Sequence, residues 1–308
     1  KPVFSNLTIN WETLIFSIIL ILAVVTRFYD LEARVMSHDE NSHVYYSWQL
    51  EQGSGYTHTP MTHGPFQFHV VALSYFMFGD NDFTARIPAA LFGIATVAFL
   101  WFYRRYLGRA GTLIAAALML ISPFMLYYAR YVRNDIFSAL FGIITFWAIL
   151  RYLETGEARY AFWLTAVTML HYTTKETSFI YSAQTLVFLG LLFVAQISRA
   201  RWQKPAHRDL FLILLLVAGI LAAIGIGLNA YFPAPEAVVT EAVAEAVETA
   251  RDIPLHLYIP LALSGLTVLG ALVLAIRGYT WEKLRQQRAF SLMLLQFTLI
   301  LPQLAPFI

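Results

Sequence analysis

About nine blocks of mostly apolar residues, each close to 20 residues long, divide this chain of 308 residues. A helix of about 20 residues crosses the ~30 Å hydrocarbon layer of a membrane. Only 13% of the residues are charged, against roughly 25% in soluble domains, which excludes an ordinary soluble enzyme. The sequence therefore predicts an all-α polytopic membrane protein with a single domain over 1–308. The expected spans are 12–28, 83–103, 110–128, 135–153, 160–178, 179–197, 210–231, 255–276 and 289–308.

Basic residues cluster in four connections between these blocks, which predicts the orientation of the chain. Such connections favour the cytoplasmic side. All four share one side, together with the N-terminus, only if the block 64–79, with about 16 apolar residues, lies at the membrane interface and does not cross. The first outer loop is then 29–82, and 235–252 is an outer amphipathic helix. The basic connections are 104–109, 151–159, 199–208 and 277–288.

The first candidate site is the segment 37–43, in the most polar part of the chain. Ser37 and Glu40 form a capping box, which predicts a helix start and places Asp39 and His43 on one helix face. A plainer interpretation is that Asp39 and Glu40 only stabilise the positive end of the helix dipole.

The second candidate is the segment 128–135, at the outer ends of two expected spans. Arg130 and Arg133 could be anchors at the membrane boundary. Guanidinium groups also match phosphate oxygens and stay charged, so the same residues, with Asp135 beside them, could hold a phosphate.

The third candidate is the turn 173–177, at the outer end of another expected span. Lys175 and Glu176 could simply form an ion pair that caps this helix. Asp80-Asn81-Asp82 is similar to the metal-binding motif of nucleotide-sugar transferases, but no glycine-rich nucleotide turn accompanies it, so we interpret it as a helix cap.

Six stretches in a fixed order carry a resemblance to one family: Asp39-Glu40, 63–68, 72–79, 83–93, 122–135 and Thr174-Lys175. They resemble the membrane-embedded glycosyltransferases of the GT-C class, in the protein O-mannosyltransferase and aminoarabinose-transferase-like superfamily. The resemblance covers roughly residues 12–200. Glu176 stands where relatives have glycine. The long, His-rich first loop looks most like prokaryotic proteins associated with flippase activity in protein glycosylation.

The resemblance implies a polyprenyl-phosphate sugar donor and no nucleotide cofactor, with the site on the outer face of a prokaryotic cell membrane. The sugar would pass with inversion to a hydroxyl of a protein or glycan acceptor. Asp39 would be the general base, with Glu40 and Asp135 as further catalytic carboxylates that orient the cations. Phosphate binding would fall to Arg130, Arg133, Lys175 and His63, and a divalent metal, where one is used, to Asp39, His43, Asp135 and Glu176.

An alternative function is a GT-C-like scaffold without the reaction, acting as a lipid-handling accessory or as a subunit of a larger membrane complex. Glu176 in place of glycine keeps this alternative open. The apolar character of the last residues also suggests a fragment of a longer chain. Neither function involves nucleic acid, in line with a formal net charge of only +2. The catalytic hypothesis predicts that Asp39, His43, Arg133, Asp135 and Lys175 line one outward-facing cavity.

Overall fold

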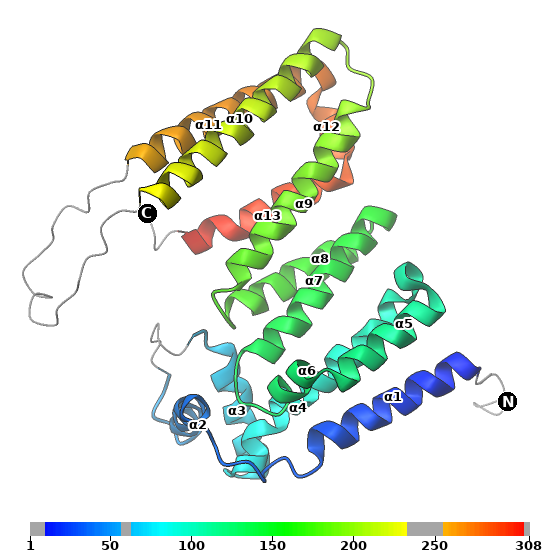
Figure 1. The fold of residues 1–308 in the computed structure, drawn as a ribbon, viewed down its shortest axis with the longest axis vertical. Helices are drawn as coiled ribbons and strands as arrows, with labels where there is room; N and C mark the ends of the chain where they lie inside the picture. The colour runs from blue at the N-terminus through cyan, green and yellow to red at the C-terminus, as the bar shows by residue number, and fades with distance from the viewer. Residues whose placement is uncertain (1–9, 57–62, 233–254, 305–308) are drawn as a thin grey trace, which may run out of the picture. The chain divides into compact units, whose positions relative to one another are not determined.

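The computed structural model describes residues 10–56, 63–232 and 255–304, and every regular element within them is a helix (Figure 1). This confirms the predicted all-α class. The chain, expected to be one domain, divides into two compact units, 1–189 with 292–308 and 190–291. The expected amphipathic helix 235–252 lies outside the described residues.

Five helices of the first unit lie side by side and form a helical bundle (Figure 1). Glu12, at the start of α1, pairs with Arg104 at the start of α5, and Arg27 Nη1 near the end of α1 donates to the Leu120 carbonyl near the end of α5 at 3.3 Å. These two helices therefore run in the same direction. The five helices are α1 (Trp11–Phe28), α4 (Asp82–Phe99), α5 (Arg104–Ile121), α7 (Asp135–Thr155) and α8 (Ala158–Tyr172).

The two basic connections of this unit meet at one end of it. Arg105 of the first connection forms an ion pair with Glu154 of the second. Their meeting agrees with the expectation that both lie on the same side of a membrane.

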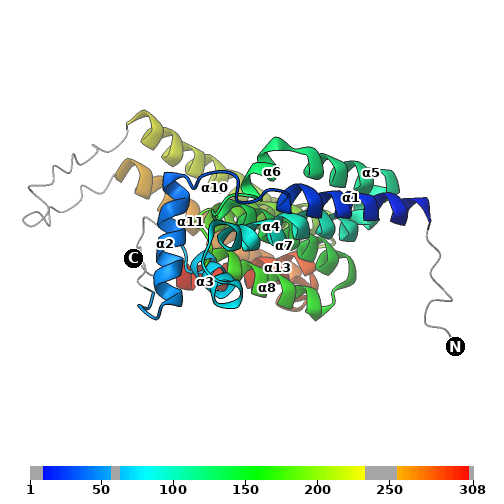
Figure 2. The same cartoon turned by 90° about the horizontal axis from the view of Figure 1, so that it is seen from below.

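Two shorter helices, α2 (His38–Glu51) and α3 (Phe66–Phe78), occupy the opposite end of the unit. Figures 1 and 2 together show α2 crosswise to α1. Because α3 has 13 residues, it is about 20 Å long, short of the ~30 Å hydrocarbon layer. This length agrees with the expectation that 64–79 does not cross. The predicted capping box is confirmed, with the Glu40 amide donating to Ser37 Oγ and the Ser37 amide to the Glu40 carboxylate.

In two of the expected spans, the helix ends before the apolar block does. The block 110–128 breaks after Ile121, and α6 (Pro123–Tyr128) begins with proline, which has no amide hydrogen to continue the preceding helix. The block 160–178 ends as a helix at Tyr172, because the turn 173–177 intervenes before α9 (Ser178–Ser198).

Six helical stretches in the described residues are long and apolar enough to cross a membrane. One of them, 82–121, contains both α4 and α5, joined by the short 3-10 helix η2 (Leu100–Tyr103). These stretches support an integral membrane protein. They are Trp11–Phe28, Asp82–Ile121, Asp135–Thr155, Ser178–Ser198, Pro205–Tyr231 and Leu255–Tyr279.

The second unit is centred on a pair of long helices, α10 (Pro205–Tyr231) and α11 (Leu255–Tyr279), followed by α12 (Trp281–Gln286). Ser264 Oγ of α11 donates to the Ala218 carbonyl of α10 at 2.9 Å. The last helix, α13 (Arg288–Leu304), begins in this unit and contributes most of its length to the first.

Candidate functional site

A chain of alternating charges lies at the end of the first unit that carries α2 and α3. Asp39 Oδ2 is 2.6 Å from Arg133 Nη1, Arg133 Nε is 3.2 Å from Asp135 Oδ2, and Asp135 Oδ1 is 2.7 Å from Lys175 Nζ. The three sequence clusters thus meet, although they lie up to about 140 positions apart in the chain. All four side chains keep some solvent exposure, from 14% for Lys175 to 51% for Asp39. We call these four residues the ion-pair chain.

Aromatic side chains pack between α3, α4 and α7, the helices that position the ion-pair chain. Phe92 of α4 meets Phe137 of α7 edge to face at 4.7 Å between ring centroids. Phe66, at the start of α3, packs in the same way on Phe137 and on Phe141. Edge-to-face pairs of this kind stabilise a core by about 0.5–1.5 kcal/mol beyond their buried area. They fix the start of α7, and therefore Asp135, against α3 and α4.

The turn 173–177 is joined to the entry of α3 by backbone hydrogen bonds. The Gly64 amide donates to the Thr174 carbonyl at 3.2 Å, and the Phe66 amide donates to the Thr173 carbonyl at 2.9 Å. A Cβ at Gly64 would lie 2.2 Å from the Thr173 oxygen, so only glycine permits this approach. The junction places His63, which precedes Gly64, beside Glu176 of the turn.

His63 and Glu176 are hydrogen-bonded across this junction, with 2.7 Å between Nδ1 and Oε2. Glu176 is therefore engaged with His63 and is not one of the four residues of the ion-pair chain. The acidic side chain of Glu176 therefore has a specific partner within this protein.

His43 lies next to the ion-pair chain but is almost completely buried, against Phe68 and stacked on His63. Burial lowers its pKa to about 4, with the charges of His63, Arg133 and Lys175 acting in the same direction and Asp39 opposing them. His43 is therefore neutral near pH 7.

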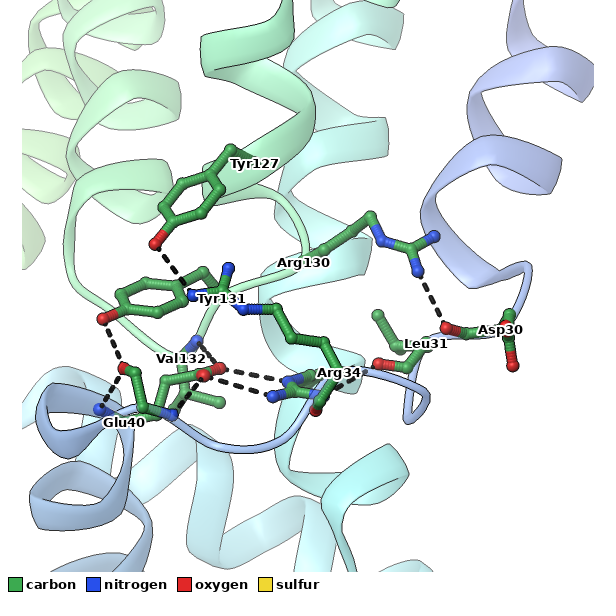
Figure 3. Close-up of polar contacts among 10 residues, drawn as sticks. Asp30, Leu31, Arg34, Glu40, Tyr127, Arg130, Tyr131 and Val132 are labelled. Carbon is green, nitrogen blue, oxygen red and sulfur yellow. Dashed lines mark hydrogen bonds and ion pairs between the residues drawn. The ribbon is translucent and has the colours of Figure 1, made fainter.

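Glu40 does not orient the cations of the ion-pair chain, contrary to the sequence-based expectation. Its carboxylate is completely buried and accepts two hydrogen bonds from Arg86, at 3.0 and 3.1 Å. It also accepts from the amides of Val132 and Ser37 (Figure 3). Four donors saturate the carboxylate, so Glu40 joins α2, α4 and the 129–134 loop as a structural connection.

Arg86 is the residue that sequence reasoning missed. It stands within a predicted span, where an ionisable side chain is costly unless a partner neutralises it. That rule could have flagged Arg86 and a buried carboxylate as a pair.

Arg130 also lies outside the ion-pair chain. Its guanidinium donates to the carbonyls of Thr26, Tyr29 and Asp30, at 2.6–2.9 Å, where α1 ends. Figure 3 shows the bond to Asp30. A cation at the C-terminal end of a helix also stabilises its dipole. The structure thus favours the anchor interpretation for Arg130 over phosphate binding.

Asn134 and Ser138 flank Asp135 and were not assigned a role by the sequence. Both are buried, and in the described residues neither the Asn134 amide group nor Ser138 Oγ has a hydrogen-bond partner. Buried polar groups without partners are uncommon.

The expected metal ligands do not come together as a metal site. Within the described residues, no group of three or more His, Asp or Glu side chains is placed to hold a metal ion. Arg133 separates Asp39 from Asp135, and Glu176 faces His63. This arrangement does not fit a divalent cation.

An apolar groove lies along the middle of α7. Two pockets, of about 340 and 310 Å³, share Gly142, Phe146 and Tyr181. Gly142 lies seven residues after Asp135, which is about 10 Å along the helix. Gly142 permits the close approach of the Tyr181 ring, since an added Cβ would stand 2.6 Å from it.

Comparison with known proteins gives one family. The model of the dolichyl-phosphate-mannose-protein mannosyltransferases matches residues 62–226, more than half of the chain. No curated protein and no solved structure matches. The matched range includes Arg133, Asp135 and Lys175, whereas Asp39 precedes it. The chain therefore belongs to the dolichyl-phosphate-mannose-protein mannosyltransferase family, a family of GT-C-type glycosyltransferases that use a lipid-linked sugar donor.

Proposed function

We propose that this protein transfers a sugar from a polyprenyl-phosphate donor to an acceptor hydroxyl at the ion-pair chain. The observation that carries the proposal is the convergence of Asp39, Arg133, Asp135 and Lys175 from three distant segments. Exposed ion pairs contribute only about 0–1 kcal/mol to stability. Stability alone therefore does not explain why these four charges gather at one place.

Arg133 and Lys175 would bind the donor phosphate. Their charges are now balanced by Asp39 and Asp135, and a phosphate would compete for both cations. When Arg133 turns to the phosphate, the Asp39 carboxylate loses its contact at 2.6 Å. It would then be free to accept a proton.

The reaction that fits these groups is a direct displacement with inversion. The acceptor oxygen forms a bond to the anomeric carbon, while the bond from that carbon to the phosphate oxygen breaks and its electron pair stays on the lipid phosphate. Asp39 takes the proton of the acceptor hydroxyl as general base. Arg133 and Lys175 stabilise the negative charge that develops on the leaving phosphate.

The groove along α7 offers a place for the polyprenyl tail. Its apolar lining, with Phe146 and Tyr181, begins within about 10 Å of Asp135 along the helix. Opposite this end, the arginines of 104–109 and 151–159 meet. The positive-inside rule supports a cytoplasmic position for them and therefore an outer position for the ion-pair chain.

The test is transfer of a radiolabelled sugar from polyprenyl phosphate by the purified full-length protein, with donor binding measured in parallel. Asp39→Asn should slow transfer by about 10²–10⁴ and leave donor binding intact, because it removes only the base. Arg133→Ala should weaken donor binding as well as rate. Glu32→Gln, at an exposed carboxylate of the same loop, is the matched control and should change neither.

Two outcomes would count against the proposal. If Asp39→Asn transfers as fast as the wild type, Asp39 is not the base. If the wild type binds the donor but transfers nothing to a panel of acceptors, the accessory or subunit function replaces the enzyme.

A further inference from the structure

A second polar site lies at the opposite end of the first unit from the ion-pair chain. From Asp135 to Arg151, α7 advances 16 residues, which is about 24 Å. The two sites are therefore too far apart to share one headgroup. At this second end lies a pocket of about 460 Å³, lined by Phe102, Arg105, Trp147, Arg151, Arg159, Tyr160 and Trp163. We call it the basic pocket.

The basic pocket carries excess positive charge. Arg105 and Arg151 both pair with Glu154, and Arg159 pairs with Glu157 at 2.7 Å. Three guanidinium groups thus face two carboxylates. No acidic residue is among those that line the pocket, so an anion that enters meets the guanidinium groups first.

Two of the three guanidinium groups are held in place by an aromatic ring. Arg151 and Arg159 both lie over the Tyr160 ring, with 5.0 and 4.9 Å to its centroid, and Arg151 donates to the Tyr160 hydroxyl at 2.9 Å. Trp147 packs edge to face on the same ring at 5.4 Å. The forks are therefore oriented in advance, which lowers the entropic cost of binding an anion.

The rim of the basic pocket is apolar and exposed. Phe102 and Trp163, which line the pocket, leave 54% and 52% of their surface open, and Phe162 next to Trp163 in the chain leaves 74% open. Aromatic residues of this kind gather where a membrane protein meets the headgroup level of a bilayer. A small soluble anion would gain nothing from such a rim, whereas the upper part of an acyl chain would pack on it.

We propose that the basic pocket binds the headgroup of an anionic phospholipid. Its phosphodiester would face Arg105 and Arg159, and its chains would leave over Phe102 and Trp163. Basic pockets between helices on the cytoplasmic side are suited to such headgroups. The site is independent of the sugar-transfer function, because it needs only that the unit be embedded in a membrane.

The experiment is native mass spectrometry of the purified full-length protein, with phosphatidylglycerol and phosphatidylcholine as probes. The wild type should retain phosphatidylglycerol in preference to phosphatidylcholine. Arg105→Ala combined with Arg159→Ala should weaken phosphatidylglycerol retention by at least about tenfold, since each basic residue near an anionic membrane surface contributes about fivefold. Both side chains are more than 60% exposed, so the fold should persist, and Arg159→Gln alone is a milder second variant.

The matched control is Arg199→Ala combined with Arg208→Ala, which removes the same charge from another basic connection. It should leave retention unchanged. Equal retention of both lipids by the wild type, or equal loss in the control, would overturn the proposal. Displacement of the lipid by millimolar inorganic phosphate would show a general phosphate site and would also overturn it.

Discussion

Asp39 and Glu40 are neighbours in the first turn of α2, and the structure gives them opposite environments. Glu40 is completely buried and bound by Arg86, whereas the Asp39 side chain is about half exposed and contacts Arg133. Both carboxylates pair with an arginine. The comparison teaches that burial and the number of donors, not the presence of an ion pair, separate a structural carboxylate from one available for chemistry.

The energetic consequences of the two pairs differ in the same way. Breaking a buried pair leaves an uncompensated charge and costs about 3–5 kcal/mol. An exposed pair contributes about 0–1 kcal/mol. Variants of the buried pair should therefore change mainly stability, and variants of the exposed pair should change mainly activity. Variants of His43 and Arg130 test the same distinction at nearby residues.

The largest expected effect is on the buried pair. Arg86→Ala should lower the free energy of unfolding by about 3–5 kcal/mol, because the Glu40 carboxylate stays buried without its cation. Thermal unfolding of the purified protein measures this. Adding Glu40→Gln to Arg86→Ala should restore part of the loss, since no buried charge then remains. A loss below about 1 kcal/mol for Arg86→Ala would contradict the structural role.

The next effect is the pH dependence of stability that arises from His43, a buried residue of the same helix as Asp39 and Glu40. Its pKa is about 4 in the folded protein, against about 6.5 in an unfolded chain. Between these values the unfolded state binds more protons, so stability is full above about pH 6.5 and falls as the pH drops towards 4. The loss should reach up to roughly 3 kcal/mol.

Unfolding free energies measured between pH 7 and pH 4 test this prediction. His43→Leu should remove most of the dependence, because it removes the group that is protonated on unfolding. An unchanged pH profile in this variant would assign the dependence to other groups.

A smaller effect on stability is expected for Arg130, which the sequence allowed to be either a membrane-boundary anchor or a phosphate ligand. Arg130→Ala should destabilise the protein by about 1–2 kcal/mol, because it removes charged hydrogen bonds to the carbonyls that end α1. Donor binding should stay at the wild-type level. Weaker donor binding at unchanged stability would return Arg130 to the phosphate ligands.

The smallest stability effect should come from the ion-pair chain. Arg133→Ala should change the free energy of unfolding by less than about 1 kcal/mol, even though it is expected to weaken donor binding. Chemical denaturation of the wild type and the variant in the same detergent compares the two. If Arg133→Ala lost as much unfolding free energy as Arg86→Ala, the exposed and the buried pair would contribute equally to stability. That result would contradict the distinction between them.

Much of the local structure could be predicted from the sequence. Apolar blocks of membrane length imply helices, and the Ser37 and Glu40 capping box correctly marks the start of α2. The short block 64–79 contains a helix of 13 residues, as its length suggested. These features depend on nearby residues, on helix length and on hydropathy.

The break at Ser122 was available in the sequence but was overlooked. Pro123 cannot continue the helix that precedes it, yet the apolar character of 110–128 suggested one continuous span. The expected bounds 160–178 likewise ran past the turn 173–177, because hydropathy averages over its few polar residues.

The sequence by itself therefore determined the helical class, the membrane setting and which polar clusters deserved study, because all three follow from the order of residues along the chain. Only the tertiary structure decided which arginine neutralises which carboxylate. Arg86, rather than Arg130 or Arg133, reaches Glu40, and Arg133 connects Asp39 with Asp135. Such pairings depend on how helices pack and which side chains become buried, and residues separated by 46 or 94 positions carry no local signal of their contact.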